Sequence, residues 1–479
     1  MGKEITRSHF HKRDFSAFDA RLREETGLLQ EWFERGVFSG LHGIGGFEVE
    51  CWLTDSEGFP APINDRLLEK LDSPLVVPEL ARFNVEINTP PQRLEGAALR
   101  HMHANFDRLW RHCEEVAATL DARMVMTGIL PTVGERALSL DNISDRTRYR
   151  ALNEQILRLR KGAPIELDIP GKQPLHTYHT DVMLESATTS FQIHLQVAPG
   201  QDMRFYNAAV ILSAPMVAVC ANSPYLFGHE LWDETRIPLF EQAVSICPPG
   251  AEICPAGRVG FGRHYLRQSL AELFIENLQD HPVLMPELSE EPPANLFHLR
   301  LHNGTIWRWN RPLIGFDDDS TPHLRIEHRV VPAGPSVIDT IANAALFYGL
   351  VQSLATDAQP PESRLPFARA HANFYAAARE GLHARLVWLD GRESTARDLV
   401  QRELLPVARR GLESLGITAE DIDLYMGVID ARVRSGCNGA EWQRRYVEKC
   451  GADMRALTLA YAARQRSGLP VHEWEIRRC

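Results

Sequence analysis

The run Phe47-Glu-Val-Glu-Cys-Trp-Leu53 alternates apolar and polar side chains. Side chains at positions i, i+2 and i+4 of a β-strand share one face, so Glu48 and Glu50 are expected to lie side by side. Three other runs alternate in the same way, at residues 82–89, 190–198 and 323–331. Together the four runs predict an antiparallel sheet with one apolar face and one polar face.

The polar faces of these four runs have an unusual composition. They carry Glu, His, Arg and amide side chains without a lysine, at Glu48, Glu50, Asn84, Glu86, Asn88, Gln192, His194, Gln196, Arg325, Glu327 and Arg329. The simpler interpretation of each strand alone is a sheet with one solvent-exposed side. Solvent-exposed faces usually mix Thr, Lys, Ser and charges, however, so a shared site on one curved sheet is the alternative that we develop.

Carboxylates that converge on one site repel one another and raise each other's pKa values. Divalent cations remove this repulsion, and a set of oxygen ligands with one imidazole suits Mg²⁺ or Mn²⁺. Replacing Glu327 is therefore expected to abolish activity and to relieve crowding between carboxylates. Arg325 and Arg329 flank Glu327 and add positive charge beside the cations. Metal ions together with planar arginine donors are what phosphoryl transfer requires.

The rest of the chain predicts an α+β protein in which helices flank this sheet. Ser336 and Asp339 form a capping box at the start of a helix that runs to about residue 354. Residues 297–310 are expected to form a hairpin with its turn at Asn303-Gly304, which would add His298, Arg300 and His302 to a polar face. Helices are expected near residues 366–385, 394–415, 418–431 and 439–466. The expected units are an N-terminal helix (1–40), a catalytic body (41–357) and a helical C-terminal part (358–479).

Composition excludes several classes of protein. The 479 residues carry 52 Lys and Arg against 63 Asp and Glu, a net charge of -11, so nucleic-acid binding is not expected. The longest apolar stretch, 208–221, is too short to cross a bilayer and contains Pro215, so a buried helix is expected. Eight cysteines without a Cys-x-x-Cys pair or a signal peptide predict reduced thiols and a cytoplasmic location. A monomer and a symmetric homo-oligomer both remain open.

Two of these strands resemble those of a known superfamily. The stretch Gly46–Glu50 is similar to the paired-glutamate strand of the glutamine synthetase-like superfamily, and Leu324–Val330 is similar to its late Arg-x-Glu-x-Arg strand. Within that superfamily the chain resembles the bacterial glutamate–cysteine ligases and related carboxylate–amine ligases. Further likeness lies at residues 79–91, 189–197, 221–236 and 436–444, so the resemblance covers most of the chain. The segment 241–291 departs from the shorter members, and the amine site is expected to differ there.

The resemblance implies a glutamine synthetase-like curved antiparallel sheet that carries the active site. It implies an ATP-dependent ligase of glutathione biosynthesis, which joins glutamate or a related acid to cysteine or another amine through an acyl phosphate. The implied cofactors are ATP and Mg²⁺ or Mn²⁺. The implied metal ligands are Glu48, Glu50, Glu86, His194 and Glu327, with Glu79 as a further candidate. Arg329 and Arg236 would be catalytic, and Arg325, Gln192 and Asn222 would contact nucleotide or substrate.

Two other functions use the same residues. A metal-dependent amide hydrolase could activate water with the carboxylate cluster, but the sequence lacks dense histidine ligation such as His-x-His or His-Glu-x-x-His. A non-catalytic relative that only binds nucleotide or an amino acid is the other alternative. All the expected acidic ligands are present, which argues against it. Release of ADP in the presence of ATP, Mg²⁺ and an amino-acid panel would separate the three functions.

Overall fold

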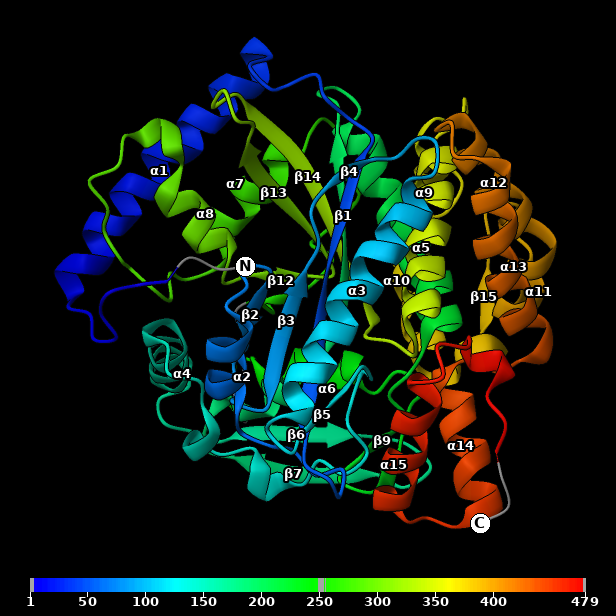
Figure 1. Cartoon of the computed structure of the whole chain (residues 1–479). Coiled ribbons are helices and arrows are strands. Elements are labelled where there is room, and N and C mark those ends of the chain that lie inside the picture. The colour runs from blue at the N-terminus through cyan, green and yellow to red at the C-terminus, as the bar shows by residue number, and fades with distance from the viewer. Residues whose placement is uncertain (1–3, 249–253, 255, 477–479) are drawn as a thin grey trace.

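A computed structural model describes residues 4–248, 254 and 256–476. Its centre is a curved antiparallel sheet (Figure 1) with the strand order β13-β14-β8-β1-β3-β2, and β4 and β5 also pair with β1. The strands are β1 (Ile44–Thr54), β2 (Val76–Pro78), β3 (Asn84–Asn88), β4 (Gln92–Arg93), β5 (Arg123–Val125), β8 (Ser190–Val197), β13 (Asn310–Phe316) and β14 (Pro322–Pro332). The four alternating runs of the sequence are therefore β1, β3, β8 and β14, as predicted.

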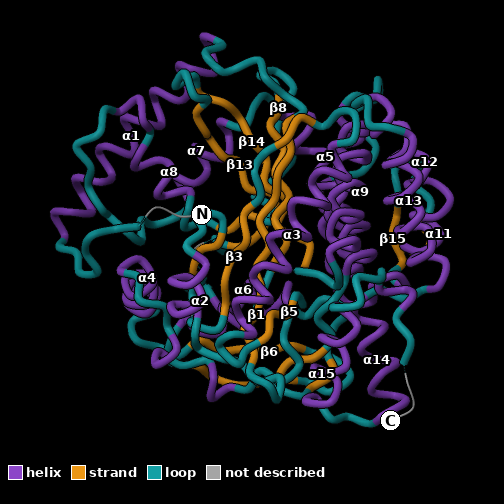
Figure 2. The backbone as a smooth tube through the Cα atoms, viewed as in Figure 1, coloured by secondary structure: helices purple, strands orange, loops and turns teal. Residues whose placement is uncertain are grey.

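Helices cover the apolar face of the sheet. They are α3 (Ala98–Ala118), α5 (Asp202–Cys220) and α9 (Val337–Ala355). The Phe47 ring packs on Phe106 of α3, and the hydroxyl of Tyr348 on α9 donates to the Gly46 carbonyl at 3.0 Å. Gly45 permits this approach, because a Cβ there would lie 2.7 Å from the Tyr348 hydroxyl. Figure 2 shows the strands between these helices and those on the opposite side.

A second set of helices stands over the polar face of the sheet (Figure 1). It consists of α1 (Lys12–Arg35), α4 (Thr147–Leu159), the short 3₁₀ helix η3 (Val182–Ala187), α7 (Ala271–Asp280) and α8 (Phe297–Asn303). The buried Glu25 of α1 fastens α8, since its carboxylate contacts His298 Nδ1 at 2.6 Å and accepts from the Leu299 amide at 2.8 Å. The polar face is consequently enclosed between the sheet and these helices.

The prediction of a hairpin at residues 297–310 is wrong. Residues 297–303 form α8, and the two-residue strand β12 (Trp307–Arg308) that follows is parallel to β11 (Val259–Gly260). The Glu25 carboxylate binds the first turn of this helix, and this tertiary contact overrides the turn preference of Asn303-Gly304. Because α8 is helical, His298, Arg300 and His302 do not form a polar strand face.

The C-terminal part packs on the helices that cover the apolar face. Helix α10 (Phe367–Glu380) contacts α5, whereas α12 (Leu405–Ser414) and α13 (Ala419–Ser435) contact α9. The helix expected over 439–466 is interrupted by Gly451, whose φ of 89° ends α14 (Gly439–Cys450) before α15 (Met454–Gln465). The remaining elements are α2 (Asn64–Leu71), α6 (Arg236–Ala243), α11 (Ala396–Leu399), β6 (Ile165–Ile169), β7 (Leu175–His179), β9 (Tyr225–Leu226), β10 (His229–Glu230), β15 (Arg385–Val387) and β16 (Glu393–Thr395).

Two helices, α5 and α9, are long and apolar enough to cross a membrane. Their most apolar windows are 89% and 83% buried inside the molecule, which is the behaviour of core helices. The expectation of reduced thiols is wrong at Cys247 and Cys254, which form a disulfide with a Cα–Cα distance of 5.2 Å. Cys450 is disulfide-bonded as well. Spacing along the sequence could not reveal these bonds, because pairing depends on distance in the fold.

Candidate active site

The strand register brings the predicted donors onto one face. Glu50 of β1 lies opposite Glu86 of β3, and Glu327 of β14 lies opposite His194 of β8. Glu48 lies opposite Gln192 on the other side of β1. Since side chains alternate along each strand, all of these groups point to the enclosed polar side. The five predicted metal ligands are therefore neighbours in the fold.

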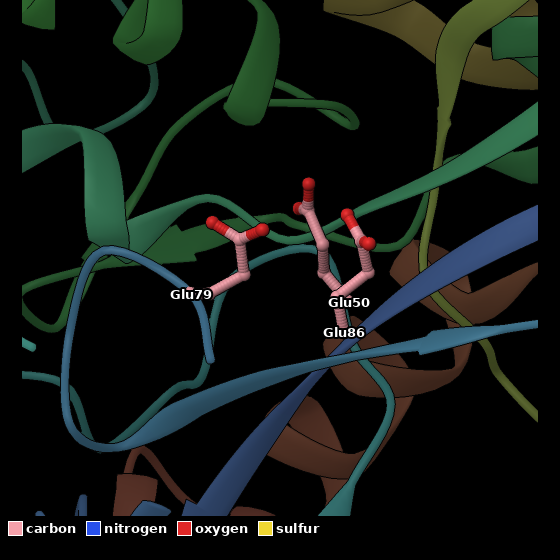
Figure 3. A group of neighbouring side chains, drawn as sticks. All are labelled: Glu50, Glu79 and Glu86. Atoms are coloured by element: carbon pink, nitrogen blue, oxygen red, sulfur yellow. The ribbon is translucent and has the colours of Figure 1, made fainter. Parts of the chain in front are cut away.

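Three carboxylates form one cluster, made by Glu50, Glu79 and Glu86 (Figure 3). One oxygen atom from each lies within 4.8 Å of the other two, and Glu79 comes from the loop between β2 and β3. Burial and then the Glu79 carboxylate raise the pKa of Glu50 to about 7. Burial and then the Glu48 carboxylate raise the pKa of Glu86 well above its usual range. A bound cation would offset this repulsion.

A second group of possible ligands lies next to this cluster. His194 Nε2 is 3.7 Å from a Glu48 oxygen and 3.6 Å from a Glu327 oxygen, which is too long for hydrogen bonds. This nitrogen is buried and has no hydrogen-bond partner among the described residues. Burial lowers the pKa of His194 to about 4, so its imidazole is neutral and can ligate a metal. Carboxylate oxygens and one neutral imidazole fit Mg²⁺ or Mn²⁺.

Two arginines hold Glu327 in place. Arg311 donates to one of its oxygens at 2.8 Å, and Arg329 donates to the other at 2.6 Å. Burial alone would raise the pKa of Glu327, but Arg311 and then Arg329 hold it well below the usual range. Arg329 also donates to the Gln192 side-chain oxygen at 2.5 Å, and Gln192 donates to Glu50 at 2.8 Å. This chain of contacts joins the two groups of ligands.

These groups line one cavity between the sheet and the helices above it. Its polar walls include Glu48, Glu50, Glu79, Glu86, Glu185, Gln192, His194, Arg148, Arg300, Arg311, Arg325 and Arg329. Its apolar walls include Leu152, Phe274, Met285, Leu301 and Trp307. A second hollow shares Glu48, His194 and Arg325 with it. Negative ligands for cations and several guanidinium groups thus face a single space, which suits a nucleotide polyphosphate with its metals.

Arg236 and Asn222, predicted to contact substrate or nucleotide, do not line this cavity. Arg236 is buried, pairs with Glu234 at 3.1 Å and donates to the Val330 carbonyl. Asn222 is also fully buried, and its amide donates to the Ala333 carbonyl and to the Tyr461 hydroxyl, both at 2.8 Å. Their hydrogen-bonding capacity is used inside the fold, so the direct contacts expected of them do not fit their positions.

The cavity also contains residues that the alternating pattern could not reveal. Arg311 lies on β13, a strand that no alternating run predicted and that is at the edge of the sheet, where its Pro312 is tolerated. Glu79 lies in a loop, so no periodicity predicts which way it points. Arg148 and Glu185 come from α4 and η3, far from the strands in sequence. One sequence signal could have suggested some of these cavity residues, namely a carboxylate or an arginine next to the end of a predicted strand.

Comparison with known proteins agrees with this geometry. A family model described as "Glutamate-cysteine ligase family 2" matches residues 44–461 of the chain. The chain belongs to this family. A protein from Salinispora tropica named "Putative glutamate–cysteine ligase 2" is 34% identical over 437 residues, covering 89% of this ligase and 95% of the relative. A protein of the same name from Salinispora arenicola is 33% identical over 434 residues, covering 88% and 94%.

Membership in glutamate–cysteine ligase family 2 makes the protein an ATP-dependent ligase that forms a C–N bond. The fold of this ligase is also that of the glutamate–cysteine ligase from Francisella tularensis, solved in complex with AMP. The two structures agree with a TM-score of 0.57 over 90% of each chain, at 12% sequence identity. The predicted curved sheet with flanking helices and a helical C-terminal part is confirmed.

Proposed function

We propose that the ligase joins the side-chain carboxylate of glutamate to the amine of cysteine. The observation that carries the proposal is the convergence of Glu50, Glu79 and Glu86 beside the Glu48, His194 and Glu327 group. In this proposal each group holds one divalent cation, Mg²⁺ or Mn²⁺. Such cations neutralise the polyphosphate of ATP and polarise its terminal phosphoryl group. The names of the relatives support the choice of acid and amine.

The residues of the chain then have distinct tasks. The acid carboxylate attacks the terminal phosphorus of ATP, which gives an acyl phosphate and ADP, and the amine then displaces phosphate from the acyl carbon. Arg329 stabilises the negative charge of the transferring phosphoryl group, and Gln192 and Glu327 hold its guanidinium in position. Arg325 contacts the polyphosphate. The helices over the polar face keep bulk water from the acyl phosphate.

Release of ADP tests the proposal directly. Purified protein with ATP, Mg²⁺, glutamate and a panel of amines is expected to release ADP only when acid and amine are both present, or fastest then. Product mass identifies the amide. An amide hydrolase would act without ATP, and a protein that only binds nucleotide would release no ADP, so either result contradicts the proposal. We also propose that the ligase is cytoplasmic, as the sequence predicts.

The variant Arg329→Lys tests the role of the guanidinium. Lysine keeps the charge but cannot bridge two oxygens of a phosphoryl group. Loss of a transition-state contact of about 3–4 kcal/mol corresponds to roughly 10²–10³ in rate. We expect kcat and kcat/KM to fall together, with little change in the KM for ATP. A lowered melting temperature with nearly unchanged kcat would show instead that Arg329 is only the partner of Glu327.

A further inference from the structure

Helix α1 has no task in the proposed mechanism, although it lies beside the cavity. It spans Lys12–Arg35 and therefore precedes residues 44–461, the part of the chain that the family model matches. Figure 1 shows α1 next to α7 and α8, two of the helices that stand over the polar face of the sheet. Phe18, Leu22 and Glu25 are among the residues that α1 buries. Any effect of α1 on the cavity passes through the helices that it contacts.

A buried carboxylate joins α1 to the start of α8. Glu25 contacts His298 Nδ1 at 2.6 Å with one oxygen and accepts from the Leu299 amide at 2.8 Å with the other. His298 Nε2 accepts from the Ser289 amide at 3.3 Å, which assigns the imidazole proton to Nδ1 and makes this nitrogen a donor to Glu25. The Phe18 ring packs edge-on against the same imidazole, with 5.2 Å between the ring centroids. Both oxygens of one carboxylate thus fix the start of α8.

The residue that follows Leu299 lines the cavity. Arg300 lies there together with Leu301 of the same helix. Its guanidinium carbon is 5.4 Å from the centre of the Phe316 ring of β13, which is a cation–π contact. Among the residues that the structure describes, no hydrogen bond or ion pair engages this guanidinium. Its N–H donors are therefore available to a ligand in the cavity.

Arg300 and Arg325 bring two like charges to the same cavity. Burial, and then the charge of Arg325, lower the pKa of Arg300 below its ordinary value, so the two groups interact. Arg325 Nε is buried and has no hydrogen-bond partner in the described part of the chain. Two guanidinium groups that face one space repel each other, and an anion bound between them removes the repulsion. A polyphosphate, with its several charged oxygens, complements both groups.

We propose that Arg300 contacts the polyphosphate of ATP and that Glu25 is the positioning residue for Arg300. Glu25 binds the first turn of α8 and so fixes the backbone from which the Arg300 side chain extends over Phe316. A misplacement of about 1 Å is enough to weaken a contact of this kind strongly. This inference rests on the proposed function and extends it to α1, which then sets the affinity for the nucleotide.

A double-mutant cycle between Glu25 and Arg300 tests the inference. The probe is a non-hydrolysable ATP analogue with Mg²⁺, and calorimetric titration measures its binding without turnover. We expect Arg300→Gln to weaken binding of the analogue at least tenfold and to leave binding of adenosine, which has no phosphate, unchanged. We expect Glu25→Gln to weaken binding of the analogue as well. In the Glu25→Gln background, Arg300→Gln should then have little further effect, because the guanidinium is already displaced.

A purely structural role of Glu25 predicts a different result. Glu25→Gln would then lower the melting temperature, and Arg300→Gln would keep its full effect on the analogue in either background. Additive effects of this kind overturn the positioning role. Unchanged binding of the analogue by Arg300→Gln overturns the phosphate contact. If Glu25→Gln does not fold, Glu25→Asp replaces it in the cycle, because aspartate keeps the buried charge but is one methylene too short to make both contacts.

Matched controls lie on the same helix. Glu31→Gln and Arg35→Gln change exposed residues of α1 and are expected to bind the analogue as the parent protein does. A parent protein that gives the expected cycle but releases no ADP with acid and amine contradicts the proposed function and supports this inference. A parent protein that releases ADP, with an Arg300→Gln variant that binds the analogue equally well, supports the function and contradicts the inference.

Discussion

Two glutamates of the same site have opposite electrostatic surroundings. Glu86 faces other carboxylates, whereas Glu327 is held between Arg311 and Arg329. The sequence predicts crowding at both positions, and for Glu327 this expectation is wrong because β13 supplies an arginine that no pattern indicated. Replacing either residue removes a proposed metal ligand, but the effects on folding are expected to differ in sign.

We expect Glu86→Gln to abolish turnover and to stabilise the metal-free protein by about 1 kcal/mol at pH 8. The pKa of this carboxyl is higher in the folded than in the unfolded state, so its cost to stability grows as pH rises, and the gain should shrink toward pH 5. Glu327→Gln should also abolish turnover but destabilise the protein by about 3–5 kcal/mol, because two buried arginines lose their partner. Urea unfolding of both variants in chelator measures this contrast, and equal shifts would contradict it.

A histidine outside the site should give the protein a measurable acid sensitivity. His302 on α8 is buried, and burial followed by the charge of Arg258 lowers its pKa to about 4. The unfolded state binds a proton below about pH 6.5, whereas the folded state does not until about pH 4. Stability is therefore lost as pH falls through this window, by on the order of 2 kcal/mol between pH 7 and pH 4.5.

The variant His302→Gln checks this effect. Glutamine can still donate to the Asn277 carbonyl, which His302 Nε2 contacts at 3.1 Å, but it does not titrate. We expect the difference in unfolding free energy between pH 7 and pH 4.5 to shrink in the variant by about that amount. An unchanged pH dependence would mean that the imidazole is already charged in the folded protein.

At the scale of elements, the predictable features are those that depend on local periodicity. The period of two placed Glu48, Glu50, Glu86, His194 and Glu327 on one face, and pairing of the strands brought them together. Features that depend on a distant partner were not predictable. Helix α8 depends on Glu25, 274 positions before Leu299, and the internal roles of Asn222 and Arg236 depend on partners such as Tyr461 and Val330.

The packing of α9 against α12 depends on two glycines. A Cβ at Gly411 would overlap the carbonyl oxygen of Gly349, and a Cβ at Gly349 would overlap that of Ala408. We expect Gly411→Ala to destabilise the protein by about 2 kcal/mol or more, because neither backbone can move away cheaply. Gly427 in α13 has no atom within 4 Å of its Cβ position, so Gly427→Ala should stabilise by about 0.5–1 kcal/mol. Thermal unfolding of the two variants decides whether the contact is tight.

For the whole molecule, we expect the fold to persist when the metal is removed. The hydrophobic core extends through both helical layers and the sheet, so folding does not depend on a metal as it does in a zinc finger. We expect a chelator to abolish activity while the circular dichroism spectrum and cooperative unfolding remain, and Mg²⁺ or Mn²⁺ to restore activity. A protein that unfolds in chelator would show that the carboxylate cluster is structural.

The position of α15 has a consequence for synthesis on the ribosome. Tyr461 and Gln465 reach back to the Met126 carbonyl beside β5, and Tyr461 also contacts Asn222. Translation therefore delivers these contacts more than 100 residues after β14, the last strand of the sheet, has been made. Until α15 packs in place, part of the apolar interior beside the sheet stays exposed to solvent. During elongation the protein is therefore expected to bind chaperones that shield apolar surface.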